Sequence, residues 1–394
     1  MGFWVFIGIW VTLNVAATRA LLRAASVGFE RPGMHIAMVW IAPFMGAGMA
    51  LLDASRYQRA NREAVQSAAL LDAEAGPPPS TDLALPGGRV VPLRAALAQV
   101  NGFPLLNWQT VNAELAGLGD AERPVARAAS QRLWLEHMRH ALGPHFRLTE
   151  TDHAFVLSSL EEGPQRAIAS YIASTRKKVT HLLNGLAAFP AEGKSVLLVL
   201  DDEEWYYHYV SVYYPSEGEF AFSGGMFINA GCPHFVVRRS DLAQIEPVIA
   251  HELTHSALAH LKLPLWLDEG IAVNTERRIA GAQPSLHTPR EIDGMQRRFW
   301  GQPEIQQFWS GESFQRTDDG NLLSYELARV MVEQMARDWQ PFAEFVRDAQ
   351  RSDAGAASAL QHLKIDLGAA AAALTGQLTD AGWSPRWDDL HARS

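Results

Sequence analysis

The stretch IAHELTHSALAHLKLPLWLDEGIAV, residues 249–273, constrains this chain more than any other part of it. His251 and His255 are four residues apart, so on a helix their side chains lie one above the other, about 6 Å apart along the axis. Two imidazole nitrogens placed in this way can reach one metal ion at about 2.0–2.1 Å each. Glu252 points to the adjacent face, where its carboxylate can contact a water molecule on the metal without binding the metal itself. Pro247 suits the first turn of the predicted helix.

A catalytic zinc site needs a third protein ligand and one open position. The only cysteine, Cys232, excludes a cysteine-rich cluster, so we expect histidine and carboxylate ligands. Pro264 ends the first helix, and LWLDEGIAVNTERRIA is expected to fold back as a second helix. Glu269 in its first turn is the predicted third ligand, and Asp268, about 100° away around the helix, is its rival. The one that does not bind the metal is expected to cap the helix or to hydrogen-bond a histidine.

Two other residues near the motif are weaker candidates. His260 follows His255 by five residues, whereas a metzincin site needs a histidine six residues on with a glycine between them, so we reject it as a ligand. Glu276 lies two helical turns after Glu269. It is either an acid that supports the metal-binding helix or a surface charge, and the sequence slightly favours the surface charge.

HELTH followed by WLDEGIA resembles the gluzincin zinc metallopeptidases of the peptidase MA-like superfamily. In that family a glutamate in the second helix, just before a glycine, completes the HExxH site. The resemblance implies one zinc ion held by His251, His255 and Glu269, with Glu252 activating the water. Thirteen residues separate His255 from Glu269, fewer than in the aminopeptidase branch, and the G-x-M-E-N signature of that branch is absent. The resemblance covers about residues 145–350.

The same resemblance extends to two less specific features. The family tends to carry a tyrosine at the start of a later helix, and NLLSYELARVMVEQM offers Tyr325, whose phenol can stabilise an oxyanion. The alternative is that Tyr325 only packs at an interface between lobes. FSGGMFINAG, residues 222–231, loosely matches the edge strand that lies along the substrate in that family.

The N-terminus contains two uncharged apolar runs, residues 2–18 and 34–52. Each is close to the length that spans a bilayer, so we predict a two-helix transmembrane hairpin over residues 1–55. The alternatives are a buried hairpin of a soluble protein, or a removed leader followed by one anchor. Arginines occur only after the first run, which favours a cytoplasmic loop and an extracytoplasmic catalytic lobe. The expected location is therefore the inner membrane of a bacterium, with the lipid bilayer as a partner.

The remaining pattern predicts an α+β fold with a small mixed sheet packed on the HExxH helix, as in zincins. We expect strands in FRLTETDHAFVLSSL, KSVLLVLDD, EWYYHYVSVYYP, EFAFSGGMFINAG and HFVVRR, and helices elsewhere. The predicted segments are a stalk and Pro/Gly-rich linker over residues 56–89, a helical segment over 90–143, a catalytic α/β lobe over 144–285, and a helical C-terminal lobe over 286–394.

The composition limits the class of partner. The net charge is −9, the isoelectric point is near 5.9 and there is no basic stripe, so a nucleic-acid partner is not expected. The expected function is hydrolysis of peptide bonds in a peptide or protein substrate by a zinc metallopeptidase. The alternatives are a non-peptidase zinc amidohydrolase and a catalytically silent binding or scaffold protein. The glutamate at position 252 argues against the silent protein, because a binding site has no use for that acid. The sequence does not indicate an oligomeric state.

Overall fold

The most apolar short segments of the chain form the centre of a five-stranded mixed sheet. In the computed structural model, which describes residues 77–213, 225–282 and 286–386, the strand order is β5-β6-β7-β9-β8. β6, β7 and β9 are parallel, while β5 and β8 are antiparallel edges. Every residue of β6 and β7 is buried, as expected for strands covered on both faces. The bounds are β5 Arg147–Glu150, β6 Ala154–Ser158, β7 Ser195–Leu200, β8 Gly225–Ala230 and β9 Cys232–Arg238.

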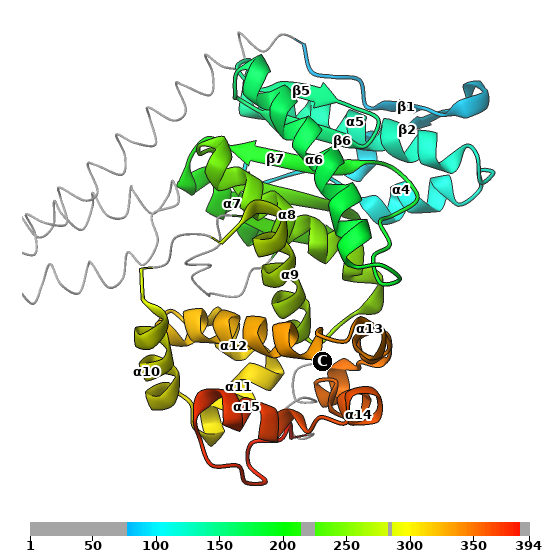
Figure 1. Ribbon diagram of the computed structural model, residues 1–394. Helices are drawn as coiled ribbons and strands as arrows, with labels where there is room; N and C mark the ends of the chain where they lie inside the picture. Colours follow the sequence, from blue (N-terminus) through cyan, green and yellow to red (C-terminus); the bar gives the residue numbers. More distant parts are fainter. Residues whose placement is uncertain (1–76, 214–224, 283–285, 387–394) are drawn as a thin grey trace, which may run out of the picture. The chain divides into compact units, whose positions relative to one another are not determined.

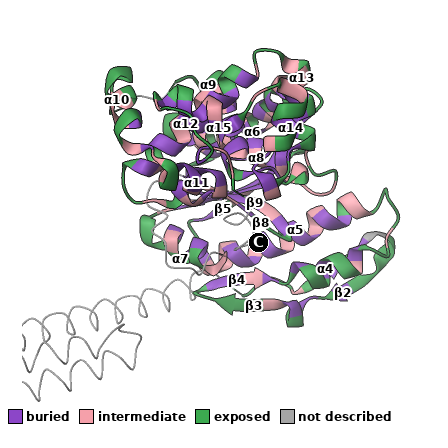
Figure 2. Cartoon of the chain, turned by 90° about the horizontal axis from the view of Figure 1, so that it is seen from below, coloured by how far each residue is buried: buried purple, intermediate pink, exposed green. Residues whose placement is uncertain are grey.

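Helices cover both faces of this sheet (Figure 1). α5 and α7 share a core with Phe155 and Leu198 on one face, whereas α6 and α8 share a core with Val156 and Leu197 on the other. These residues alternate along β6 and β7 because successive side chains of a strand point to opposite faces. Figure 2 shows the same division, with buried residues toward the interior and exposed residues on the outer sides of the helices. The bounds are α5 Arg123–Leu142, α6 Glu162–Leu182, α7 Glu203–Tyr213 and α8 Leu242–Leu258.

The chain after α8 is largely helical and builds a further hydrophobic core. Trp266, near the start of α9, packs in this core against Phe308 and Phe345. α9 and α12 approach closely because Gly270 has no side chain: a Cβ there would lie 2.6 Å from the backbone oxygen of Ala328. The bounds are α9 Leu265–Ala280, α10 Pro289–Phe299, α11 Gln302–Ser310, α12 Asp319–Met335, α13 Trp339–Asp348, α14 Ala356–Ser358 and α15 Leu367–Thr375.

Two β-hairpins precede α5, which differs from the prediction of a linker followed by helix. The turn between β3 and β4 is Asn101–Gly102, and both residues have positive φ, as a type I′ hairpin turn requires. The Asn-Gly pair was therefore a hairpin signal that the helical interpretation of residues 90–143 missed. The bounds are β1 Asp82–Ala84, β2 Val90–Pro92, β3 Leu97–Val100, β4 Phe103–Leu106 and α4 Trp108–Leu115.

The prediction of a strand in EWYYHYVSVYYP is wrong, because its described residues lie in α7. The Asp202 side chain accepts a hydrogen bond from the Trp205 backbone N–H at 2.8 Å and so starts the helix. Tyr206, Tyr209 and Val210 are buried at helical spacing. Aromatic and β-branched side chains are typical of strands, but here the buried residues recur three and four positions apart, which is the spacing of a helix. FRLTETDHAFVLSSL, predicted as one strand, forms the antiparallel pair β5 and β6.

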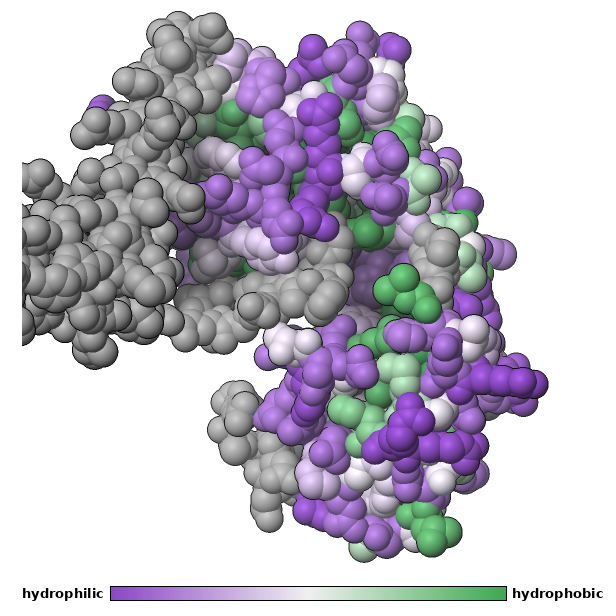
Figure 3. Space-filling view, turned by 90° about the vertical axis from the view of Figure 1, so that its left-hand side faces the viewer, coloured by the Kyte–Doolittle hydropathy of each residue, from purple (hydrophilic) through white to green (hydrophobic). Residues whose placement is uncertain are grey.

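The predicted membrane-spanning fold is corrected by the helices that the structure contains. Within residues 77–213, 225–282 and 286–386, no helix is both long and apolar enough to cross a bilayer. α6, one of the longest, carries charges throughout, including Arg166, Arg176 and Lys177. On the face shown in Figure 3, hydrophobic residues occur in small groups among hydrophilic ones. We therefore correct the fold class to α+β with a five-stranded sheet and helices, and withdraw the inner-membrane location and the bilayer partner. The predicted hairpin, residues 1–55, lies outside the described residues.

Candidate metal centre

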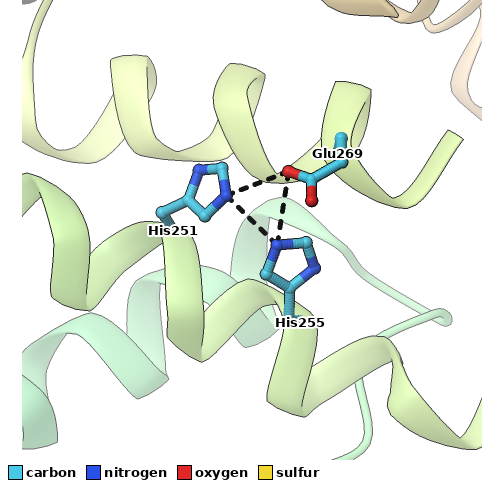
Figure 4. Close-up of side chains that lie close together, drawn as sticks. All are labelled: His251, His255 and Glu269. Carbon is cyan, nitrogen blue, oxygen red and sulfur yellow. Dashed lines mark hydrogen bonds and ion pairs between the residues drawn. The ribbon is translucent and has the colours of Figure 1, made fainter. Parts of the chain in front are cut away.

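The turn between α8 and α9 brings the two halves of the motif together. After α8 the chain makes one short 3-10 turn, passes through Lys262 in the left-handed conformation, and enters α9 directly after Pro264. The two helices then pack against each other. As a result, His251 and His255 on α8 and Glu269 on α9 point toward one another (Figure 4). Pro247 was expected in the first turn of the helix, but α8 begins at Leu242, so Pro247 lies inside it.

The distances among these three side chains suit one tetrahedral metal ion. His251 Nε2 lies 3.1 Å from His255 Nε2 and 3.2 Å from Glu269 Oε2, and His255 Nε2 lies 3.5 Å from Glu269 Oε2. The edges of a regular tetrahedron are about 1.6 times its centre-to-vertex distance, so zinc–ligand bonds of about 2.0–2.1 Å need donors about 3.3–3.4 Å apart. Two imidazole nitrogens and one carboxylate oxygen also form a ligand set found in catalytic zinc sites.

Two further carboxylates determine which nitrogen of each histidine faces the others. Glu276 Oε2 lies 3.1 Å from His251 Nδ1, and Asp268 Oδ2 lies 3.1 Å from His255 Nδ1. A carboxylate accepts hydrogen bonds only, so each Nδ1–H donates, and Nε2 is the nitrogen of each ring that can give its electron pair to a cation once a proton no longer occupies it. Those two electron pairs converge with the Glu269 oxygen, an arrangement that a cation between them stabilises. Carboxylates that hold metal-binding histidines in this way are common in metal sites.

These contacts decide two alternatives that the sequence left open. Asp268 hydrogen-bonds a histidine, which is one of the two roles expected for the acid that does not bind the metal. Glu276 is not a free surface charge, because its side chain is only 19% exposed and contacts His251. The sequence slightly favoured the wrong alternative for Glu276, although its two-turn spacing from Glu269 was the available signal.

The charged side chains of this cluster shift one another's pKa values. Burial alone would lower the pKa of His251, but hydrogen bonds to Glu269 and Glu276 outweigh it and raise the pKa to about 9. Burial of His255 is outweighed in the same way by Asp268 and Glu269, so its pKa also lies well above the usual value. Burial would raise the pKa of Glu269, yet the two imidazoles hold it far below its usual range. Three carboxylates thus surround two imidazoles, and the cluster favours positive charge at its centre.

Glu252 lies beside this cluster but is not one of its three converging donors. Its side chain is buried, and burial raises the pKa of its carboxyl even though the charges of His251 and His255 oppose the change. The nearby backbone N–H of Phe227, on the edge strand β8, also lowers that pKa. A raised pKa makes this carboxylate a better proton acceptor near neutral pH.

Tyr325 lies on α12, the helix that packs closely against α9 at Gly270. Burial raises the pKa of its phenol well above the usual value, and the charges of Glu269 and Glu252 raise it further. Its ring packs edge-on against Phe314 at 5.1 Å. The phenol therefore stays protonated and lies within electrostatic range of the cluster, so it can donate a hydrogen bond.

His260, rejected as a ligand, lies in the turn after α8 and is exposed, outside the three-residue cluster. The chain matches no known protein family, and no curated protein matches it. The case for a metal site therefore depends on side-chain geometry and on the motif.

Proposed function

We propose that this protein is a zinc-dependent metallopeptidase of the gluzincin type. The observation that carries the proposal is the convergence of His251 Nε2, His255 Nε2 and Glu269 Oε2 at separations of 3.1–3.5 Å. The buried acid Glu252 beside this group supports a hydrolytic rather than a structural role, because a structural zinc site needs no free acid.

The side chains have complementary roles in the proposed reaction. A zinc ion held by His251, His255 and Glu269 would supply Lewis acidity, polarising a substrate carbonyl and making a water molecule more acidic. Glu252 takes the proton from the attacking water and then passes it to the leaving amine. Tyr325 donates a hydrogen bond to the negative charge that develops on the carbonyl oxygen.

The edge strand β8 favours a peptide over other amide substrates. Among the described residues, β8 pairs only with β9 and ends the sheet on that side. An extended peptide can add to such an edge through main-chain hydrogen bonds. Phe227 of β8 lies next to Glu252, so a peptide on this edge would run past the proposed proton acceptor.

The test uses the purified full-length chain, its metal content and its cleavage of casein. We expect about one zinc per chain, casein cleavage that a chelator abolishes, and restoration by added zinc. Glu252→Gln should keep the zinc and lose cleavage. Glu246→Gln makes the same chemical change on the same helix, five residues before His251 and outside the group of three converging donors, and should leave both unchanged.

Three outcomes would contradict the proposal. Equal cleavage by Glu252→Gln and the parent chain would show that Glu252 does not transfer the proton in this reaction. A zinc-loaded chain that hydrolyses small amides but not casein would instead be an amidohydrolase. A zinc-loaded chain that hydrolyses neither would be a binding protein.

A further inference from the structure

A cavity of about 480 Å³ lies at the N-terminal ends of β7 and β9, where α5, α6 and α8 approach the sheet. This volume is within the range of small-ligand sites. Its polar wall includes Arg127 and Gln131 from α5, Arg176 from α6, Ser195 from β7 and Ser256 from α8, and Phe235 of β9 is also part of the wall. None of the three converging metal-site donors lines it.

Arg127 contributes a buried positive charge to this cavity. Its side chain donates to Asn112 Oδ1 at 2.6 Å and to the backbone oxygen of Gly231, and its guanidinium lies 4.7 Å from the ring centre of Trp108. These partners are neutral. Within the part of the chain that the structure describes, Arg127 forms no ion pair with a carboxylate.

Arg176, which is half-buried, contributes a second positive charge to the wall of the cavity. It donates from Nη1 to Ser195 Oγ at 2.7 Å, and its guanidinium stacks over the ring of Phe189 at 4.0 Å. Burial lowers its pKa, and no carboxylate among the described residues counteracts the change. Its remaining N–H groups have no acceptor in residues 77–213, 225–282 and 286–386.

The other charged groups at the cavity are already paired. Lys194 binds Glu150 at 2.7 Å, and Glu192 binds Arg123 at 2.9 Å. The two arginines therefore remain as uncompensated charges. Burying a charge without a partner is costly, whereas an anion between two guanidinium groups forms charge-assisted hydrogen bonds. The cavity is accordingly suited to an anion, and to a carboxylate in particular, because guanidinium groups bind carboxylates in bidentate geometry.

The cavity borders the proposed catalytic residues on the side of Glu252. Ser256 follows His255 directly and lies one helical turn beyond Glu252 on α8. Phe235 packs against Phe227 at 5.4 Å, and Phe227 is the β8 residue whose backbone lies next to Glu252. A peptide lying along β8 would thus have this cavity next to the bond that is cut.

We propose that the cavity is a specificity pocket that binds a carboxylate of the peptide substrate, with Arg176 and Arg127 as the binding groups. This inference depends on the proposed peptidase function and names its substrate class: peptides with an acidic side chain, or a free C-terminus, near the scissile bond. The two sources share one chemistry and are separated by experiment.

Cleavage sites in casein, identified by mass spectrometry, provide the peptides for the first test. Each peptide is made with Glu or Gln at every position flanking the scissile bond, and with an acid or an amide C-terminus. We expect kcat/KM to be about tenfold or more higher for one carboxylate-bearing form than for its neutral counterpart. Arg176→Gln should bring that ratio close to one, whereas Arg166→Gln, the same change at an exposed site on α6, should retain it. A structural role for Arg176 would lower both rates and leave the ratio unchanged.

A second test is independent of peptidase activity. The chelator-treated full-length chain, in which no metal can hold a carboxylate, is mixed with N-acetylglutamate α-amide, N-acetylglutamine or N-acetylglutamine α-amide. We expect one of the two carboxylates, but not the fully neutral amide, to raise the unfolding temperature in a concentration-dependent way. Arg176→Gln should abolish that shift and Arg166→Gln should keep it. If casein is never cut but the shift behaves in this way, the peptidase proposal fails and the pocket stands. If the shift is equal for all three compounds, or survives Arg176→Gln, the pocket proposal is overturned.

Discussion

His234 and the pair formed by His251 and His255 lie on opposite faces of the same sheet and have opposite electrostatic character. His234 on β9 faces α5 and α7, where it is surrounded by Trp134, Tyr209 and Tyr213. Its ring nitrogens contact the Tyr209 hydroxyl at 2.7 Å and the Cys232 backbone oxygen at 2.8 Å. Burial lowers its pKa to about 4, which keeps the imidazole neutral.

His251 and His255 are also shielded from solvent, with side chains 12–15% exposed, but carboxylates surround them. Here the carboxylates outweigh burial and raise both pKa values. Burial by itself therefore does not make a histidine functional. The difference lies in the neighbours: aromatic rings and neutral hydrogen-bond partners at His234, and carboxylates with convergent electron pairs at the candidate metal centre.

The largest loss of zinc binding and cleavage should come from removing one of the three side chains that converge at the candidate metal centre. We expect His255→Ala to lose zinc and all cleavage, because two remaining ligands cannot hold the ion in an open tetrahedral site. With zinc at about a thousand times its dissociation constant, the parent chain should gain about 4 kcal/mol in unfolding free energy, and His255→Ala should gain almost none. Denaturant unfolding with and without zinc measures both values.

His234→Ala is the matched control from the other face of the sheet. It should lower the unfolding free energy in every condition, because it leaves a cavity among aromatic rings. It should nevertheless keep the zinc-dependent gain. Loss of that gain in His234→Ala would show that His234 and the candidate metal centre are not independent.

The sequence predicts those parts of the candidate site that depend only on the spacing of residues along a helix. The four-residue spacing of the histidines and the proline between two helices correctly anticipated that His251, His255 and Glu269 would converge. The two-turn spacing of Glu276 from Glu269 placed both residues on one face of α9, but the contact of Glu276 with His251 also depends on how α9 crosses α8, which the spacing does not specify. Arg127 and Arg176 lie on helices that cover opposite faces of the sheet, and both line the cavity at the N-terminal ends of β7 and β9, so the sequence did not indicate that they share one site.

Tyr325 lies near the candidate metal centre and Tyr209 contacts His234, so their hydroxyls should have different roles. Tyr325→Phe should reduce kcat about 10²- to 10³-fold, the usual cost of losing one oxyanion donor, with zinc content unchanged. Tyr209→Phe removes the hydroxyl that contacts His234 and should leave kcat unchanged while lowering stability by about 1 kcal/mol. Steady-state kinetics on one casein-derived peptide tests both variants. Similar kcat values for Tyr325→Phe and the parent chain would assign Tyr325 to packing alone.

The neutral His234 should make the protein sensitive to acid. Its pKa is about 4 in the folded chain and about 6.5 when unfolded, so between these values the unfolded chain binds the extra proton. The stability from this residue is fully present above pH 6.5 and is lost as the pH falls toward 4, by about 3 kcal/mol over the whole window. His234→Gln, which does not titrate, should remove this component. Urea unfolding of both chelator-treated chains at several pH values between 4 and 6.5 measures this component. The same pH dependence of the unfolding free energy in the parent chain and in His234→Gln would contradict the expectation.

The smallest effect on the candidate metal centre should come from the carboxylate that contacts His251 on the side away from the converging donors. Glu276→Gln keeps a hydrogen-bond acceptor near His251 Nδ1 but removes the charge, so the imidazole is still oriented while its Nε2 becomes a weaker donor to the metal. We expect zinc affinity to fall about tenfold to a hundredfold, or about 1.4–2.7 kcal/mol, with one zinc still bound at saturation. Competition with a chelator of known affinity measures the change, and Glu246→Gln is the control of equal chemistry. An unchanged affinity would mean that the Glu276 charge does not act on the metal through His251. The carboxylates would then distinguish this cluster from His234 only by orienting its rings.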